Sequence, residues 1–268
     1  DDSPGAYENY VDAWLANTSY GEHLAVWWLD LVRYADTIGI HSDNPRLVWP
    51  YRDWVIRSFN ENLPFDQFTT MQLAGDLMQP EPTTDMLVAS AYNRLNLATE
   101  EGGAQAKEYQ AIYNTDRVAN YSDVWLGSSA ACAECHDHKF DPFTARDFYS
   151  LAAFFGSLNG AAVGVERGYA KHEPPYIFLP ENDQQKEEIT EVEARYREII
   201  DTHPDAALVE EYFASRNNAR PALPEGGMPA YGKDFQNLLN ERQKLAKRIP
   251  TVPVARDLNT PRTVRILA

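Results

Sequence analysis

The chain is organised around the stretch Ala131-Cys132-Ala133-Glu134-Cys135-His136-Asp137-His138-Lys139. Two thiols three positions apart, followed at once by a histidine, form the C-x-x-C-H pattern at which haem is attached covalently. Cys132 and Cys135 would each bond one vinyl group, and His136 would ligate the iron from the proximal side. These are the only two cysteines among the 268 residues, so no thiol is left over. The motif therefore predicts one haem c.

Two other interpretations use the same side chains. Cys132 and Cys135 could form a disulfide or a redox-active pair, which is typical of C-x-x-C near a βαβ pattern. No strand is expected before the motif, and no parallel α/β alternation is visible. A zinc site could add His136 and His138 to the two cysteines, but structural zinc sites usually pair two separated ligand couples. Four ligands this close in sequence do not easily adopt the tetrahedral arrangement around zinc. We therefore favour covalent haem.

The composition is that of a folded chain with an acidic surface. With 44% hydrophobic residues, six tryptophans and fifteen tyrosines, the chain can bury a sizeable core in one large domain or two smaller ones. The net charge of −16 disfavours nucleic acid and anionic membrane surfaces as partners, because both require basic patches. No run of about 18 apolar residues is present, so no membrane span is expected.

The expected location follows from the haem. The chain opens Asp1-Asp2-Ser3-Pro4, which is not a secretory signal. Covalent haem is ordinarily attached outside the cytoplasm. We therefore expect a periplasmic or extracellular protein whose export signal has been removed.

Hydrophobic periodicity predicts a mainly α fold. The expected helices of the first region are 6–17, 22–36, 51–62, 65–77, 83–93, 106–126 and one that Thr144 opens and Gly156 ends. The C-x-x-C-H motif then lies in a loop between two core helices. Residues 1–160 are expected to form a multi-helix c-type haem domain.

The composition shifts after about Gly156. Residues 157–181 are rich in glycine and then proline, which predicts a loop with room for one strand. Residues 183–202 and 232–248 predict two charge-laced helices in an antiparallel hairpin, with a short helix and a Pro/Gly-rich insertion between them. The expected apolar seam consists of Ile189, Val192, Tyr196, Ile199, Leu238, Leu239 and Leu245. The region 161–268 is thus expected to be a loop-rich linker, a charged helical hairpin and a terminal strand at 262–268, with the natural protein continuing into a further domain.

Further sequence blocks accompany the motif between Tyr20 and Phe155. They are Tyr20-Gly21-Glu22-His23-Leu24-Ala25, Trp28-Leu29-Asp30, Arg33-Tyr34-Ala35-Asp36, Trp49-Pro50-Tyr51-Arg52-Asp53-Trp54-Val55-Ile56, Gln72-Leu73-Ala74-Gly75-Asp76-Leu77, Glu101-Gly102-Gly103, Asp116-Arg117-Val118 and Cys132-Ala133-Glu134-Cys135-His136-Asp137-His138-Lys139-Phe140-Asp141-Pro142. In this order they resemble the planctomycete-type cytochrome c domain family. The resemblance implies an exported bacterial polypeptide, covalent haem, a non-classical cytochrome c fold and a second uncharacterised domain downstream. It implies no particular reaction.

The sixth iron ligand would separate an electron carrier from a haem enzyme. His41, in a polar loop with Asp43, is the leading candidate for a distal ligand or a distal-pocket acid/base, and the alternative is a histidine that caps the loop or faces water. His138 lies too close in sequence to His136 to reach the opposite haem face. We expect it to hydrogen-bond near a propionate or to Asp141.

A second polar group includes Glu101 and Arg117. Glu101 beside Gly102-Gly103 could help to bind a cation, and Arg117 could pair with Glu101 or with a haem propionate. The alternative is a buried ion pair that holds the loop before the long helix.

Two functions follow from the sequence. The first is an electron-transfer module that exchanges electrons with a partner protein or with a downstream domain of the same polypeptide. The second is a haem enzyme, an oxidoreductase or peroxidase-like, that acts on a carbohydrate-related extracellular substrate. We favour the first because the supply of distal histidines is small but not empty, so a sixth ligand is available to the iron; whether the protein is an enzyme stays open.

Overall fold

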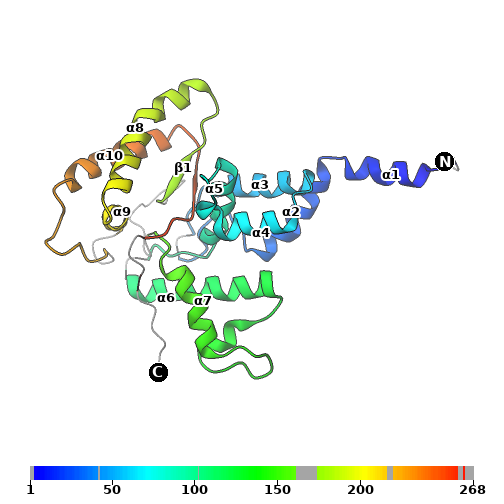
Figure 1. Ribbon diagram of the computed structural model, residues 1–268, viewed down its shortest axis with the longest axis horizontal. Coiled ribbons are helices and arrows are strands. Elements are labelled where there is room, and N and C mark those ends of the chain that lie inside the picture. Colours follow the sequence, from blue (N-terminus) through cyan, green and yellow to red (C-terminus); the bar gives the residue numbers. More distant parts are fainter. Residues whose placement is uncertain are drawn as a thin grey trace.

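The computed structural model describes residues 3–41, 43–101, 103–160, 174–215, 220–258 and 262. Within this part the chain is mainly helical, and the predicted mainly α class is confirmed. The helices form a body from which one N-terminal helix extends (Figure 1). None of the described helices has both the length and the apolar character needed to cross a membrane.

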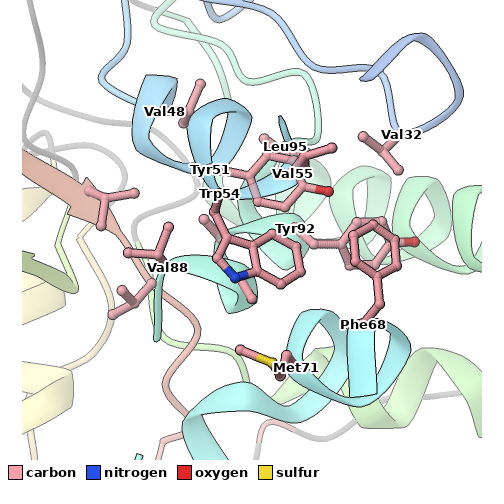
Figure 2. Packing of buried hydrophobic residues seen from close by; sticks show 14 of the residues in the cluster. Val32, Val48, Tyr51, Trp54, Val55, Phe68, Met71, Val88, Tyr92 and Leu95 are labelled. Atoms are coloured by element: carbon pink, nitrogen blue, oxygen red, sulfur yellow. The ribbon is translucent and has the colours of Figure 1, made fainter. Parts of the chain in front are cut away.

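The main hydrophobic core lies among four helices of the first region, α2 (Ser19–Leu31), α3 (Trp49–Asn60), α4 (Phe65–Ala74) and α5 (Thr84–Ser90). Trp54 stacks on Phe68 with ring centroids 5.2 Å apart, and Met71 lies beside them (Figure 2). Val252 and Val254, from the far end of the chain, complete this core. Long-range packing therefore joins the two ends of the sequence.

Helix α1 (Ala6–Leu15) has no buried residue and extends away from the other helices (Figure 1). Its aromatic side chains Tyr7, Tyr10 and Trp14 are exposed. Nothing in the described chain packs against the apolar face that its periodicity predicts.

Three predicted helices end in turns of a different pitch. Helix α4 continues as the 3₁₀ helix η1 (Gly75–Leu77), and α5 continues as η2 (Ala91–Arg94). A Cβ at Gly75 would lie 2.1 Å from the Met86 carbonyl oxygen, so only glycine allows this close approach. Helix α6 (Ala106–Tyr121) widens into the π-helical turn η3 (Ser122–Leu126).

Among its described residues the second region has the helices α8 (Asp183–Thr202), α9 (Ala206–Ala214) and α10 (Gly232–Ala246). Ion pairs link α8 to the α10 side: Glu188 with Arg248, Glu193 with Arg242 and Arg195 with Glu241. Residues further along α8 pair with residues earlier in the sequence on the α10 side, so the two helices run in opposite directions. Their buried faces share one apolar cluster with α9, and this cluster includes Ile189, Val192, Tyr196, Leu238 and Leu245.

A small antiparallel sheet in the second region packs against the core of the first. Strand β1 (Tyr176–Phe178) pairs with β2 (Thr251–Pro253). β1 falls in the stretch where the sequence left room for a strand, whereas β2 was not predicted, because three residues that follow Pro250 and end on Pro253 are too few to show alternation. The strand expected at 262–268 lies outside the described residues except for Arg262. Residues 251–258 therefore tie the second region to the first across the expected boundary near residue 160.

Candidate functional site

Cys132 lies in the 3₁₀ turn η4 (Ala130–Glu134), between α6 and α7 (Ala145–Gly156), and Cys135 is the residue that follows this turn. Residues three apart in a 3₁₀ helix lie above one another. Ala130 and Ala133 are three apart and are 1% and 0% exposed, so they face the protein interior. Cys132 and Cys135 are also three apart, and both are exposed free thiols. Both thiols are therefore exposed to solvent, whereas the two alanines of the turn face the interior.

Helices α6 and α7 hold this turn from both sides. Ala133 packs with Val118, Phe148 and Ala152 of these helices. The Glu134 side chain accepts a hydrogen bond from the Thr115 hydroxyl at 3.1 Å, and the Glu134 carbonyl accepts one from the Tyr149 hydroxyl at 3.0 Å. The position of the turn is thus fixed by side chains of α6 and α7, which lie outside the C-x-x-C-H motif.

The residues after the motif are fastened to the start of α7. The Asp137 carboxylate accepts a hydrogen bond from the Ala145 backbone N–H at 2.8 Å, which satisfies one of the unpaired donors at a helix N-terminus. Thr144 and Asp147 form a reciprocal capping box. Hydrogen bonds from Thr144 lower the pKa of the Asp147 carboxyl, which keeps it ionised at the positive end of the helix dipole.

His136 is exposed, and its ring has a defined orientation. The Nδ1 atom lies 2.8 Å from the Asp137 carbonyl oxygen. A carbonyl oxygen only accepts hydrogen bonds, so Nδ1 carries the proton in this contact and Nε2 keeps its lone pair. A ring N–H held by a backbone carbonyl is the arrangement found in most histidines that ligate a metal through the other nitrogen.

His138 has the opposite tautomer. Its Nδ1 atom accepts hydrogen bonds from the backbone N–H groups of Asp141 at 2.8 Å and Phe140 at 3.3 Å. The proton of the neutral ring is therefore on Nε2, and neither nitrogen offers a free lone pair. The Asp141 carboxylate lies 3.5 Å from the same Nδ1, too far for a hydrogen bond. His138 closes the loop after the motif, and its side chain is only 8% exposed.

The geometry bears on one of the alternative uses of the cysteines, the zinc site. Cys132 and Cys135 are not joined by a disulfide. In the part of the chain that the structure describes, no group of three or more His, Cys, Asp or Glu side chains could hold a metal ion. The ring nitrogens of His138, which the zinc interpretation requires, are already engaged.

His41 lies in an exposed loop with a positive φ of 60°. The contacts that anchor this loop run to residues 98–100, where the Ala98 N–H donates to the Ile38 carbonyl and Asn44 donates to the Glu100 carboxylate. The motif is anchored instead on α6 and α7. No described contact brings His41 to His136.

Arg117 and Glu101 lie apart from the motif as well. Arg117 follows Thr115 by two positions on α6, which corresponds to about 200° around the helix axis. Thr115 contacts the motif, so Arg117 points to the other side of α6, where it donates to Asn93 and Asn96. Glu101 is exposed, and its N–H donates to the Thr99 hydroxyl.

Sequence reasoning missed the residues that position the motif. Thr115, Glu134, Asp137 and Tyr149 act through contacts between segments that are up to 19 residues apart. Only the spacing Thr144-x-x-Asp147 carried a local signal, that of a helix N-terminus.

The fold and the site define a mainly helical protein with an exposed dithiol–histidine turn. A family model described as PSCyt2, a protein of unknown function (DUF1549), matches residues 1–159. This match covers more than half of the chain and includes the C-x-x-C-H motif, so the chain belongs to the PSCyt2 family. No curated protein and no solved structure matches the chain. The family description assigns neither a cofactor nor an activity.

Proposed function

We propose that residues 1–160 form a c-type haem domain that transfers electrons in an exported bacterial protein. The observation that carries the proposal is the pairing of two exposed thiols with the tautomer of His136. Cys132 and Cys135 are free and exposed, and the Asp137 carbonyl leaves His136 Nε2 with a lone pair. Neither feature is required by packing of the turn.

The residues present fit the attachment of one haem c. Cys132 and Cys135 would form the two thioether bonds, and His136 Nε2 would ligate the iron. The Asp137 carbonyl would orient the imidazole ring and increase its basicity. Phe140 is 84% exposed, and this apolar ring four residues after His136 is available to cover the macrocycle. The bound haem would supply one-electron chemistry.

Electron transfer is proposed in preference to catalysis because the chain has a small supply of histidines, His41 first among them, that could fill the sixth iron position and so keep substrates from the iron. The redox partner would be another protein or a downstream domain of the same polypeptide. The net charge of −16 favours a partner with a basic docking face. An exported location follows from the compartment in which covalent haem is attached.

The test is to express the chain with an export signal and a haem-attachment system. We expect a covalent haem that survives denaturation and gives the pyridine haemochrome spectrum of two saturated vinyl groups. Cys132→Ala and Cys135→Ala should each remove one thioether bond, whereas His138→Ala should retain both. A chain that acquires no covalent haem would refute the proposal.

The spectrum of the loaded protein also separates the two functions. For an electron carrier we expect a six-coordinate low-spin ferric haem that does not bind cyanide or azide. A high-spin haem that binds these anions would instead point to an enzyme acting on a carbohydrate-related substrate. His41→Ala tests the distal candidate, because loss of a sixth ligand converts low-spin haem to high-spin haem.

A further inference from the structure

A polar cavity lies on the side of α6 away from the motif. The space in it that can hold the centre of a water molecule is about 30 Å³, and one side is open to solvent. The side chains that line it include two arginines whose guanidinium groups donate to backbone carbonyls, Arg46 to Asn96 and Arg94 to Asn159. Further lining residues are Gln110, Tyr113 and Arg117.

Arg117 brings a charge to this cavity and forms no ion pair among the described residues; the nearby Asp116 carboxylate, which raises the pKa of Arg117, is ion-paired with Arg33. Its guanidinium donates to the Asn93 carbonyl at 2.9 Å and to the side-chain oxygens of Asn96 at 2.8 Å and Asn114 at 3.4 Å, all of them neutral. Burial, with the charge of Arg94 nearby, lowers the pKa of Arg117 to about 9. The group is still protonated at neutral pH, so it is a partly buried cation whose hydrogen-bond acceptors are neutral.

Asn159 supplies an independent observation. Its residue is 3% exposed and lines the same cavity, yet neither its Nδ2 nor its Oδ1 atom has a hydrogen-bond partner. Buried side-chain amides are nearly always paired, because an unpaired donor or acceptor keeps the full cost of its lost hydration. An unpaired donor and an unpaired acceptor on one side chain indicate a ligand that offers both kinds of group.

We propose that this cavity binds a small oxyanion that also carries a hydroxyl group, as a hydroxycarboxylate does. The oxyanion would lie against Arg117 and accept from Asn159 Nδ2, and the hydroxyl would donate to Asn159 Oδ1. Gln110 lines the cavity and adds a further amide. The site is separate from the proposed haem turn, because Thr115 and Arg117 point to opposite sides of α6. The ligand is either a free small anion or the acid end of a larger sugar acid that enters from the open side.

The probes are glycolate, acetate and glucuronate, each titrated into the purified full chain by calorimetry and thermal shift. We expect glycolate to bind and to raise the thermal midpoint, and acetate, which lacks the hydroxyl, to bind about fivefold or more weakly. If both glucuronate and glycolate bind, the ligand is the acid end of a sugar acid. If only glycolate binds, the ligand is a free small anion. No binding by glycolate, or equal binding by acetate, would overturn the proposal.

Two variants separate binding from folding. Asn159→Leu removes a side chain without partners, so we expect an unchanged or higher midpoint and a loss of glycolate affinity of about tenfold or more. Asn120→Ala is the matched control, because Asn120 is buried but fully paired, with the Tyr92 hydroxyl and the Leu31 carbonyl. It should lower the midpoint and keep the response to glycolate. Undiminished glycolate binding by Asn159→Leu would show that a structural water, rather than a ligand, pairs Asn159.

Discussion

Arg242 is the most completely buried charge between α8 and α10, at 0% exposure. Its Nε donates to Glu193 at 2.7 Å, its Nη2 donates to the Tyr176 carbonyl at 3.2 Å, and its guanidinium carbon lies 3.6 Å from the centroid of the Tyr196 ring. A guanidinium held by a carboxylate, a carbonyl and an aromatic face has given up its hydration for these contacts. We therefore predict that its removal destabilises the second region.

The magnitude follows from what Arg242→Met leaves behind. Removing one partner of a buried ion pair typically costs about 3–5 kcal/mol. Two carboxylates lie beside Arg242 and would lose it as a partner, Glu193 and Glu210. Glu210 would keep its contacts with Arg256 and Tyr196, and the Glu193 side chain is 18% exposed and can be hydrated. The expected loss is thus at the low end, about 3 kcal/mol, which corresponds to a fall of roughly 6–12 °C in thermal midpoint.

Urea unfolding followed by circular dichroism measures the effect. The matched control is Arg195→Met on the same helix pair, because Arg195 and Glu241 form a 3.3 Å ion pair with side chains 46% and 47% exposed. Exposed pairs contribute less than about 1 kcal/mol. If Arg242→Met cost no more than Arg195→Met, the buried network would not be what stabilises this part of the fold.

Three further predictions concern the first region. Gly75→Ala should lower the unfolding free energy by about 2–4 kcal/mol, because its Cβ would lie 2.1 Å from the Met86 carbonyl oxygen. The control is Gly103→Ala, which has open space around it and should cost under about 1 kcal/mol. Equal costs for the two variants would contradict this. Burial raises the pKa of Asp76 from 3.8 to about 6, so its contribution to stability is full below about pH 4 and is lost as the pH rises through 6. Asp76→Asn should therefore raise the unfolding free energy at pH 7.5 by about 1–2 kcal/mol, after allowance for partial exposure, with no gain at pH 3.5; a gain at both pH values would assign the effect to something other than titration. Helix α1 has ten residues and none buried, so its amides should exchange with solvent faster than those of α3 in a hydrogen-exchange experiment, and comparable protection would indicate a covering partner in solution.

Local patterns in the sequence were enough to predict most of the helices, and they are the basis for the haem prediction at the motif. The i, i+3, i+4 spacing of apolar residues and the caps at Thr83 and Thr144 place helices close to their observed positions. These signals act within one or two turns of chain, so they survive in a single sequence. They overextended α6, because Ser122 bonds back to the Val118 and Ala119 carbonyls where the helix widens.

The C-x-x-C-H motif shows the same division. Spacing alone identifies two thiols and an adjacent histidine as a haem-attachment pattern. Spacing does not say whether both thiols face outward, and it does not distinguish His136 from His138. Those properties depend on hydrogen bonds to the Asp137 carbonyl and to the Asp141 N–H, which exist only once the loop is folded onto α7.

The sequence by itself determined the helical class, the family and the candidate haem ligands. Only the tertiary structure placed Arg117 on the side of α6 away from the motif and joined Val252 to the N-terminal core. It also left the side-chain amide of Asn159 without a hydrogen-bond partner beside a cavity. Such features depend on contacts between residues far apart in the chain, as in the bond from Arg94 to the Asn159 carbonyl. Hydrophobic periodicity reports which face of a helix is buried, but not which segment covers it. The cavity and the buried charges could therefore be recognised only after the chain had folded around them.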